Sequence, residues 1–134
     1  MAQAVLRLKL LELTFGILKL RPSHPFPDWL TDVPLYFVAR TEDEFSVMCP
    51  QAAIPSEFEY SAHWRCLRVD GELAFDEVGV AAMVASPLAE AGLSIFVVST
   101  HDRDYVFVAG KDLQQALSIY EHTGFLITGA DNGL

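Results

Sequence analysis

The sequence predicts an α+β fold made of two related units, each built on an antiparallel sheet. Two observations carry this prediction. Residues 60–128 follow the order strand, helix, strand, strand, helix, strand. The stretch "PLYFVARTEDEFSVMC", Pro34–Cys49, is echoed by "LSIFVVSTHDRDYVFVA", Leu93–Ala109, as two apolar runs around a polar turn. Repeats of this kind indicate a duplicated structural unit.

The first half is expected to be mostly β. Apolar residues alternate over 6–10 and change phase over 11–17, so we expect one long strand with a bulge or two strands joined by a tight turn. Four prolines within 21–34 predict a loop with room for one helical turn around 28–30. Further strands are expected at 35–40 and 44–49.

The second half is expected to form a complete β-α-β-β-α-β unit. This is the ferredoxin-like order, whose antiparallel sheet carries both helices on one face. A first helix over 77–91 has Asp76 as its N-cap, Gly92 at its C-terminal end and Pro87 in its interior. The open face of the sheet needs cover, which another unit can supply. Strands are expected at 60–69, 93–100, 104–109 and 125–128.

A second helix is expected over 112–123. Asp112 and Gln115 form a capping box before an apolar stripe, and Gly124 follows the last turn. The stripe has helical spacing, so one face of this helix should pack on the sheet. Its members are Leu113, Ala116, Leu117 and Tyr120.

The two halves correspond segment by segment. The proline-rich loop of the first half occupies the position of the long first helix of the second half, so we interpret the first half as a degenerate repeat of the second. We expect a degenerate unit over 1–58 and a complete unit over 59–134. The aligned segments are Leu35–Thr41 with Ser94–Thr100 and, after one inserted turn residue, Phe45–Cys49 with Tyr105–Ala109.

Charge excludes two classes of partner. Eighteen acidic and nine basic residues give a net charge of -9, and no Lys/Arg cluster interrupts the sequence. We therefore expect neither nucleic acid nor an anionic membrane as a partner, because both need concentrated positive charge. The uncharged run from Leu13 to Leu18 is too short for a signal peptide core or a membrane span.

Cysteine usage and hydrophobicity indicate the compartment and the assembly. Cys49 and Cys66 lie in apolar, strand-like contexts, which favours buried free thiols in a reducing cytosol over a disulfide. We therefore expect a cytoplasmic location. Hydrophobic residues make up 51% of the chain, so apolar surface is expected to be covered in a homodimer.

The sequence contains no motif typical of an enzyme. Nucleophile, phosphate-loop and dinucleotide signatures are absent, and the histidines lack zinc spacing, so we expect no catalysis, no metal and no cofactor. Asp102 and Asp104 flank Arg103 in a turn, where acids are usually solvated. A small enzyme that uses Asp102, Asp104 or His101 as acid or base is the less favoured alternative. The histidines are His24, His63, His101 and His122.

A small-molecule site is predicted at one end of the second sheet. Ser99 and Thr100 end one strand and Asp104 begins the next, so hydroxyl groups and a carboxylate converge there. Gly79, in the first turn of the helix, would let a ligand approach backbone N–H groups that favour carboxylates. Asp104 could bind an ammonium or guanidinium group. The combination suits a free amino acid.

A structural interpretation of the same residues stays open. Gly79 would then serve helix-to-strand packing, and Ser99 and Thr100 would simply end a strand. Asp76 and Glu77 also count against a bound carboxylate, because they already supply negative charge near the helix start. On this interpretation the protein is an interaction module that binds another protein and has no pocket.

The stretch "VGVAAMVASPLAEAGLSIFVVSTHDRDYVFV", residues 78–108, resembles the ACT domain, in particular its tandem branch that includes the CASTOR arginine sensors. "LAEAGLSIFVVST" and "DYVFV" carry most of the likeness, and the element order over 60–128 agrees with it. The resemblance implies a non-catalytic regulatory module that binds small effectors, commonly amino acids, at interfaces between ACT units. A chain with one pair of units would have to dimerise to reproduce the interface of the sensors.

The resemblance also implies where the ligand binds. In the arginine sensors the ligand contacts the start of the first helix, the end of the following strand and its turn. The charged turn "HDR" differs from the more aromatic turn of those sensors, which leaves the identity of the ligand open. Together with the strand-end hydroxyl identified above, the expected ligand-binding residues are Val78, Gly79, Ser99, Thr100, His101, Arg103 and Asp104.

Overall fold

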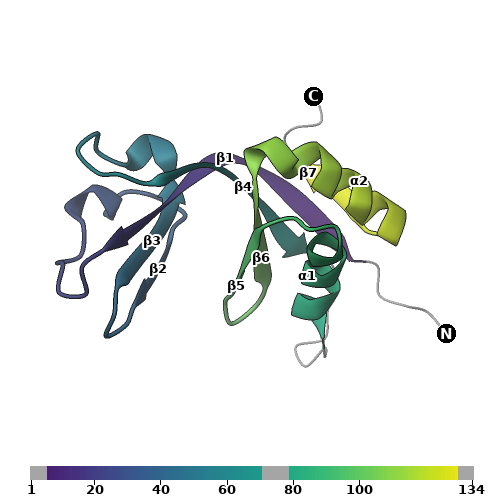
Figure 1. Cartoon of the computed structure of the whole chain (residues 1–134), viewed down its shortest axis with the longest axis horizontal. Coiled ribbons are helices and arrows are strands. Elements are labelled where there is room, and N and C mark those ends of the chain that lie inside the picture. Colours follow the sequence, from purple (N-terminus) through teal and green to yellow (C-terminus); the bar gives the residue numbers. More distant parts are fainter. Residues whose placement is uncertain (1–5, 71–78, 130–134) are drawn as a thin grey trace. The chain divides into compact units, whose positions relative to one another are not determined.

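The computed structural model describes residues 6–70 and 79–129 (Figure 1). Its contacts divide the chain into two compact units, and the strands β1 (Arg7–Leu20) and β4 (Ser61–Asp70) contribute residues to both. These compact units differ from the repeat units expected at 1–58 and 59–134, because unit 1 combines two separate stretches of sequence. The expected division into repeats after residue 58 therefore stays a prediction. Unit 1 is Met1–Glu12 with Arg65–Leu134, and unit 2 is Leu13–Trp64.

Unit 1 contains the predicted β-α-β-β-α-β order. After β4 its elements are α1 (Val80–Glu90), β5 (Ile95–Ser99), β6 (Asp104–Ala109), a 3-10 turn (Gly110–Asp112), α2 (Leu113–Thr123) and β7 (Leu126–Gly129). Its strands lie in the order β7-β1-β4-β6-β5, so β1 separates the first and last strands of the unit. β5 and β6 pair antiparallel, whereas β7 pairs with β1 in parallel. The α+β class and the ferredoxin-like unit are confirmed, and the β1–β7 pair is an addition to them.

Both helices begin differently from the prediction. α1 starts at Val80, three residues later than expected, and Gly79 precedes it with a φ of 82°. The expected cap Asp76 lies outside the described residues. α2 starts after Asp112, whose side chain makes no capping hydrogen bond, so the expected capping box is wrong at that residue. The predicted helix ends are confirmed, since Gly92 and Gly124 have φ angles of 81° and 106°.

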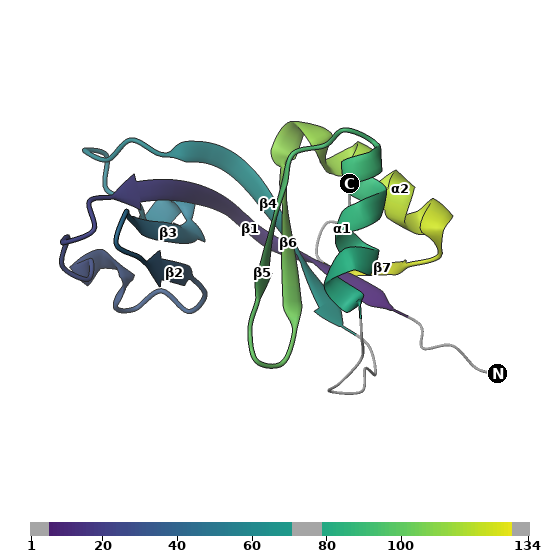
Figure 2. The same cartoon turned by 60° about the horizontal axis from the view of Figure 1, so that its bottom comes forward.

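The core of unit 1 lies between its sheet and the two helices (Figure 2). Leu67 and Val69 of β4 point toward α1 and α2, because both belong to the buried cluster that includes residues of these helices. Side chains alternate along a strand, so Arg68 and Asp70 lie on the opposite face of β4. The buried cluster also includes Leu6, Leu8, Leu10, Val80, Val84, Leu88, Val106, Val108, Leu113, Ala116, Tyr120 and Phe125.

Unit 2 is the helix-poor unit that the sequence predicts. The expected helical turn is present at Asp28–Leu30, and a second 3-10 turn follows at Gln51–Ala53. β2 (Phe37–Arg40) pairs antiparallel with β3 (Phe45–Pro50), which pairs antiparallel with the second part of β1. The buried residues of its core are Leu18, Leu20, Leu30, Phe45, Val47, Cys49 and Ile54.

β1 is a single strand of 14 residues, as one of the two open alternatives expected. Its predicted change of phase is wrong in one respect. Leu13, expected on the buried side, is 38% exposed, whereas Leu18 and Leu20 are buried. Leu8 and Leu10 of β1 therefore pack in the core of unit 1, and Leu18 and Leu20 pack in the core of unit 2.

Candidate functional site

The turn between β5 and β6 is closed by hydrogen bonds between Thr100 and Arg103. The Thr100 backbone N–H and hydroxyl donate to the Arg103 carbonyl at 2.8 and 3.0 Å. In unit 2, Thr41 and Glu44 close the β2–β3 turn in the same way, at 2.8 and 3.4 Å. The two turns are therefore equal in length, and the expected inserted residue is wrong. Thr100 thus has a structural role that Thr41 shares, and its ligand role stays a prediction.

Ser99 and Asp104 meet directly where β5 ends and β6 begins. They are paired in the register of the hairpin, and the Ser99 hydroxyl donates to Asp104 Oδ1 at 2.5 Å. By alternation they share a face with the pair Ile95 and Val108, which packs in the helix-side core. The predicted convergence of a hydroxyl and a carboxylate is therefore present, on the face that carries the helices.

The start of α1 lies at the same end of unit 1 as this turn (Figures 1 and 2). Gly79 occupies the N-cap position without a side-chain hydrogen bond, and the first turn of α1 contains no acidic residue. A Cβ built at Gly79 would meet no heavy atom of the described chain within 4 Å. No described atom therefore blocks the approach of a ligand to Gly79, which the sequence predicted. Val78, Asp76 and Glu77 lie outside the described residues.

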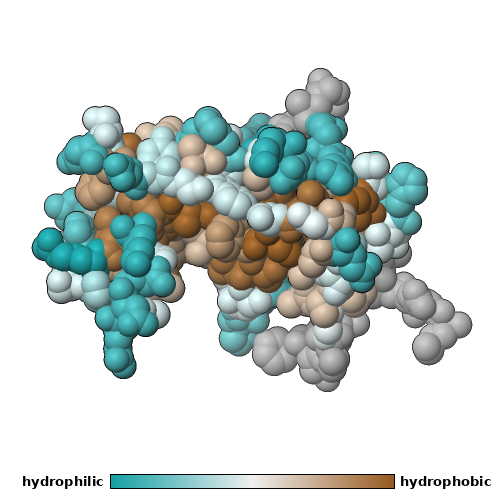
Figure 3. All heavy atoms as spheres, viewed as in Figure 1, coloured by the Kyte–Doolittle hydropathy of each residue, from teal (hydrophilic) through white to brown (hydrophobic). Residues whose placement is uncertain are grey.

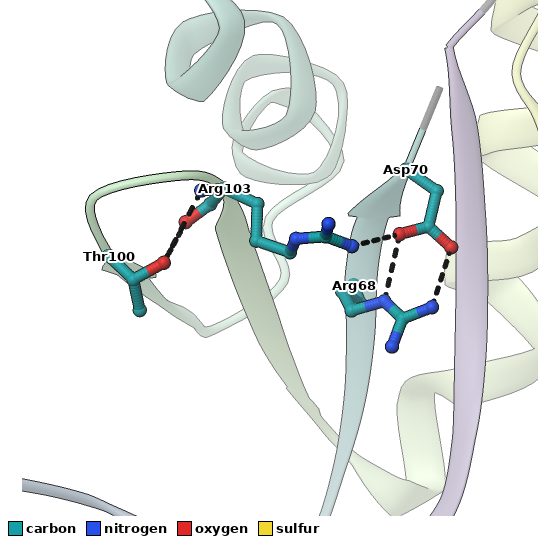
Figure 4. A network of polar contacts seen from close by, with 4 residues as sticks. All are labelled: Arg68, Asp70, Thr100 and Arg103. Atoms are coloured by element: carbon teal, nitrogen blue, oxygen red, sulfur yellow. Dashed lines mark hydrogen bonds and ion pairs between the residues drawn. The ribbon is translucent and has the colours of Figure 1, made fainter. Parts of the chain in front are cut away.

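Arg103 points away from this site, toward the end of β4 (Figure 4). Its Nη1 donates to Asp70 Oδ1 at 2.8 Å. Arg68 binds the same carboxylate with two bonds, from Nε to Oδ1 at 2.8 Å and from Nη2 to Oδ2 at 2.9 Å. Partial burial raises the pKa of Asp70, but the hydrogen bond from Arg68 and the charges of Arg68, Arg103 and Lys9 outweigh it and hold the pKa below its ordinary value.

His101 and Asp102 form the exposed tip of the turn. His101 Nδ1 lies 2.8 Å from Asp102 Oδ1, and the two side chains are 82% and 77% exposed. The predicted residues therefore separate into three groups: Ser99 and Asp104 face the helix side, Arg103 faces the end of β4, and His101 lies at the tip.

Sequence reasoning missed Arg68 and Asp70. Arg68 belongs to the strand expected at 60–69 and Asp70 directly follows it, and a spacing of two along a strand places both on one face. That spacing was the available signal. The contact of Arg103 with Asp70 joins residues far apart in the chain, and no local pattern predicts it.

The two cysteine thiols of the described chain are not activated for chemistry. Burial raises the pKa of the Cys49 thiol to about 11. Burial raises the pKa of the Cys66 thiol to about 12, although the charge of Arg68 lowers it in part, so neither thiol is an activated nucleophile.

Within residues 6–70 and 79–129, no group of three or more His, Cys, Asp or Glu side chains could hold a metal ion. No described helix is long and apolar enough to cross a membrane.

Comparison with known proteins identifies the family. The model of the ACT domain matches residues 59–121, and a model of an N-terminal domain matches 14–57. A crystal structure from Agrobacterium tumefaciens is 33% identical, with a TM-score of 0.88, and the alignment covers 94% of each chain. The chain belongs to the ACT-domain family. The recognition of an ACT domain from the sequence is thereby confirmed.

Two further proteins resemble this ACT protein to different extents. The cytosolic arginine sensor for mTORC1 subunit 1 of Rattus norvegicus is 27% identical over 99 residues, which cover 68% of this chain and 30% of the sensor. The chain thus spans about a third of that protein. The regulatory subunit of aspartate kinase from Thermus thermophilus has a TM-score of 0.58 at 15% identity, covering 84% of this chain and 93% of that chain. That likeness concerns the fold alone.

Proposed function

We propose that this ACT protein is a non-catalytic regulator that binds a free amino acid, or a similar small metabolite, between the β5–β6 turn and the start of α1. The observation that carries the proposal is the Ser99–Asp104 pair, at the same end of unit 1 as the uncapped helix start at Gly79. A relative at 27% identity is an arginine sensor, which supports an amino-acid ligand without naming which one.

The two halves of the site suit the two charges of an amino acid. The first turn of α1 offers backbone N–H groups with no side-chain cap and no acid nearby in the helix, an arrangement that favours a carboxylate. Asp104 and Ser99 offer oxygen atoms to an ammonium group. The sequence-based objection from Asp76 and Glu77 still stands as a prediction, because both residues lie outside the described residues.

Dimer contacts would transmit occupancy of the site. Hydrophobic residues gather over the β5–β6 hairpin on the face shown in Figure 3. Phe96 and Val97 of β5, which ends the strand order, are 43% and 37% exposed. An edge strand with exposed apolar side chains favours association with another chain. We therefore also propose that the protein acts as a homodimer in the cytoplasm.

A thermal-shift screen of the twenty amino acids tests the proposal, read together with sedimentation of the free and liganded chain. A ligand at about 100 times its Kd adds roughly 2.7 kcal/mol to the free energy of unfolding and raises Tm by several degrees. The absence of any shift at millimolar concentrations would remove amino-acid binding as the function, and a monomer under all conditions would remove the dimer.

Gly79→Ala and Gly92→Ala form a matched pair for locating the site. The two glycines flank α1, have φ angles of 82° and 81°, and have no described heavy atom within 4 Å of a built Cβ. Each substitution should cost about 1 kcal/mol of stability through backbone strain. Only Gly79→Ala should also weaken ligand binding. Equal binding by both variants would place the ligand elsewhere.

The exposed hairpin also supports a second candidate function, an interaction module without a small-molecule ligand. The observation in its favour is the exposure of Phe96 and Val97. On this alternative Asp104→Ala disrupts capture of a protein partner, and no amino acid shifts Tm in the wild-type chain.

A further inference from the structure

We propose that unit 1 carries a second site, on the face of its sheet opposite the helices, where Arg68 and Arg103 bind a small anion with a carboxylate or phosphate group. This site does not depend on the amino-acid site proposed above. That site uses Ser99, Asp104 and Gly79 on the helix side, whereas Arg68 and Asp70 lie on the other face of β4.

Asp70 holds the two guanidinium groups in fixed positions. Arg68 contributes a two-bond pair at 2.8 and 2.9 Å, and Arg103 adds a third bond to the same carboxylate at 2.8 Å. These bonds use only part of each guanidinium fork, so further N–H donors remain on both arginines. Planar forks held by a carboxylate are preorganised for bidentate binding of a second anion.

The two side chains are also reachable from solvent. The side chain of Arg68 is 30% exposed and that of Arg103 is 41% exposed, while that of Asp70, which organises them, is 21% exposed. Within residues 6–70 and 79–129, Nη1 of Arg68 donates to no protein acceptor. An anion can therefore bind the outer edge of the cluster without displacing Asp70.

The charge of the cluster is unusual for this chain. Arg68, Arg103 and the nearby Lys9 carry three positive charges, and Asp70 returns one negative charge. The chain as a whole has only nine basic residues and a net charge of -9. Positive charges held close together repel one another, and a bound anion relieves that repulsion. The cluster thus offers an anion a local excess of positive charge.

The ligand should be small. Three cations are too few to follow a nucleic-acid backbone, and the net charge of -9 repels a polyanion at longer range. A carboxylate or phosphate group can form two parallel hydrogen bonds with one guanidinium fork.

Titration of the full-length chain with inorganic phosphate and with succinate, in a low-chloride buffer, tests the site. Calorimetry gives the affinity, and NMR of the arginine Nε–H groups and backbone amides gives the location. We expect saturable binding of at least one probe, with the Nε–H signals of Arg68 and Arg103 moving most. Signals that move instead at Gly79 and Ser99 would overturn this proposal while supporting an anion-binding helix start. No saturable binding of either probe would also overturn it.

Arg68→Gln and Lys19→Gln are the matched variants, because each removes one positive charge from a strand. Lys19 is exposed on the second part of β1 and takes no part in the cluster. Arg68→Gln should weaken anion binding about tenfold or more, and Lys19→Gln should change it less than about twofold. Equal losses would indicate a general effect of net charge and contradict the site. Should Arg68→Gln fail to fold, Arg103→Gln, which leaves the Arg68–Asp70 pair intact, answers the same question.

Discussion

Among the described carboxyl groups of unit 1, Asp70 is one whose ionisation should contribute to stability. Its pKa lies below the ordinary value, because the bond from Arg68 and the charges of Arg68, Arg103 and Lys9 outweigh the effect of partial burial. A carboxyl group with a lower pKa in the folded chain stabilises the fold above its unfolded-state pKa. This contribution is lost as the pH falls through the folded-state value.

Asp70→Asn should therefore lower the free energy of unfolding by about 1–2 kcal/mol at pH 7, a figure limited by the partial exposure of both arginines. The difference from the wild-type chain should begin to shrink below pH ~4, where Asp70 of the unfolded wild-type chain becomes protonated, and should be lost as the pH falls through the lower folded-state pKa. Urea denaturation at pH 7 and pH 3 measures both effects.

The control for this substitution is Asp102→Asn, in the exposed tip of the neighbouring turn. The Asp102 side chain is 77% exposed, so its loss should change stability by less than about 0.5 kcal/mol. A difference between Asp70→Asn and wild type that persists unchanged at pH 3 would show that packing, and not the charge of Asp70, accounts for the loss.

Between elements, α1 and α2 are joined by a buried hydrogen bond. The hydroxyl of Tyr120 in α2 donates to the Val84 carbonyl in α1 at 2.5 Å, and the side chain is fully buried. Burial raises the pKa of Tyr120, so the group stays protonated. Its ring also meets Phe125 edge to face, with centroids 5.1 Å apart. The pair thus fixes how the two helices meet over the sheet.

Tyr120→Phe should lower the free energy of unfolding by about 1 kcal/mol, because it removes one buried hydrogen bond and keeps the ring packing. Chemical denaturation measures the loss. Tyr36→Phe is the control, since Tyr36 in unit 2 contacts Phe26 through its ring, and its hydroxyl has no bond to the described chain. A loss of similar size in the control would mean that the hydroxyl bond of Tyr120 contributes nothing specific.

The sequence predicts elements better than it predicts their first residues. Hairpins and helix ends were confirmed because their signals are local: a polar turn between apolar runs, or a glycine with a positive φ such as Gly92. The start of α1 was missed because Gly79 at φ 82° cannot continue a helix backward toward Asp76. The predicted capping box at Asp112 was wrong because a 3-10 turn, Gly110–Asp112, leads directly into α2.

At the scale of the whole molecule, unit 1 is assembled from two separate stretches of sequence. β1 lies between β4 and β7, and Leu6, Leu8 and Leu10 belong to the same buried cluster as the helices of unit 1. The repeat pattern could not predict this insertion, because strand pairing between distant segments leaves no mark on local periodicity. The candidate site was only partly predictable for the same reason, since Arg103, directly before β6, bonds to Asp70 on the neighbouring strand β4.

Leu8→Ala should therefore destabilise unit 1, although Leu8 lies far in sequence from the helices of that unit. Leu8 is fully buried, so its truncation should cost about 3 kcal/mol and expose the amides of α2 to faster hydrogen exchange. Leu13→Ala, on the same strand but 38% exposed, should cost less than about 1 kcal/mol. If Leu8→Ala leaves exchange in α2 unchanged, the first strand is dispensable and residues 65–134 hold their own core.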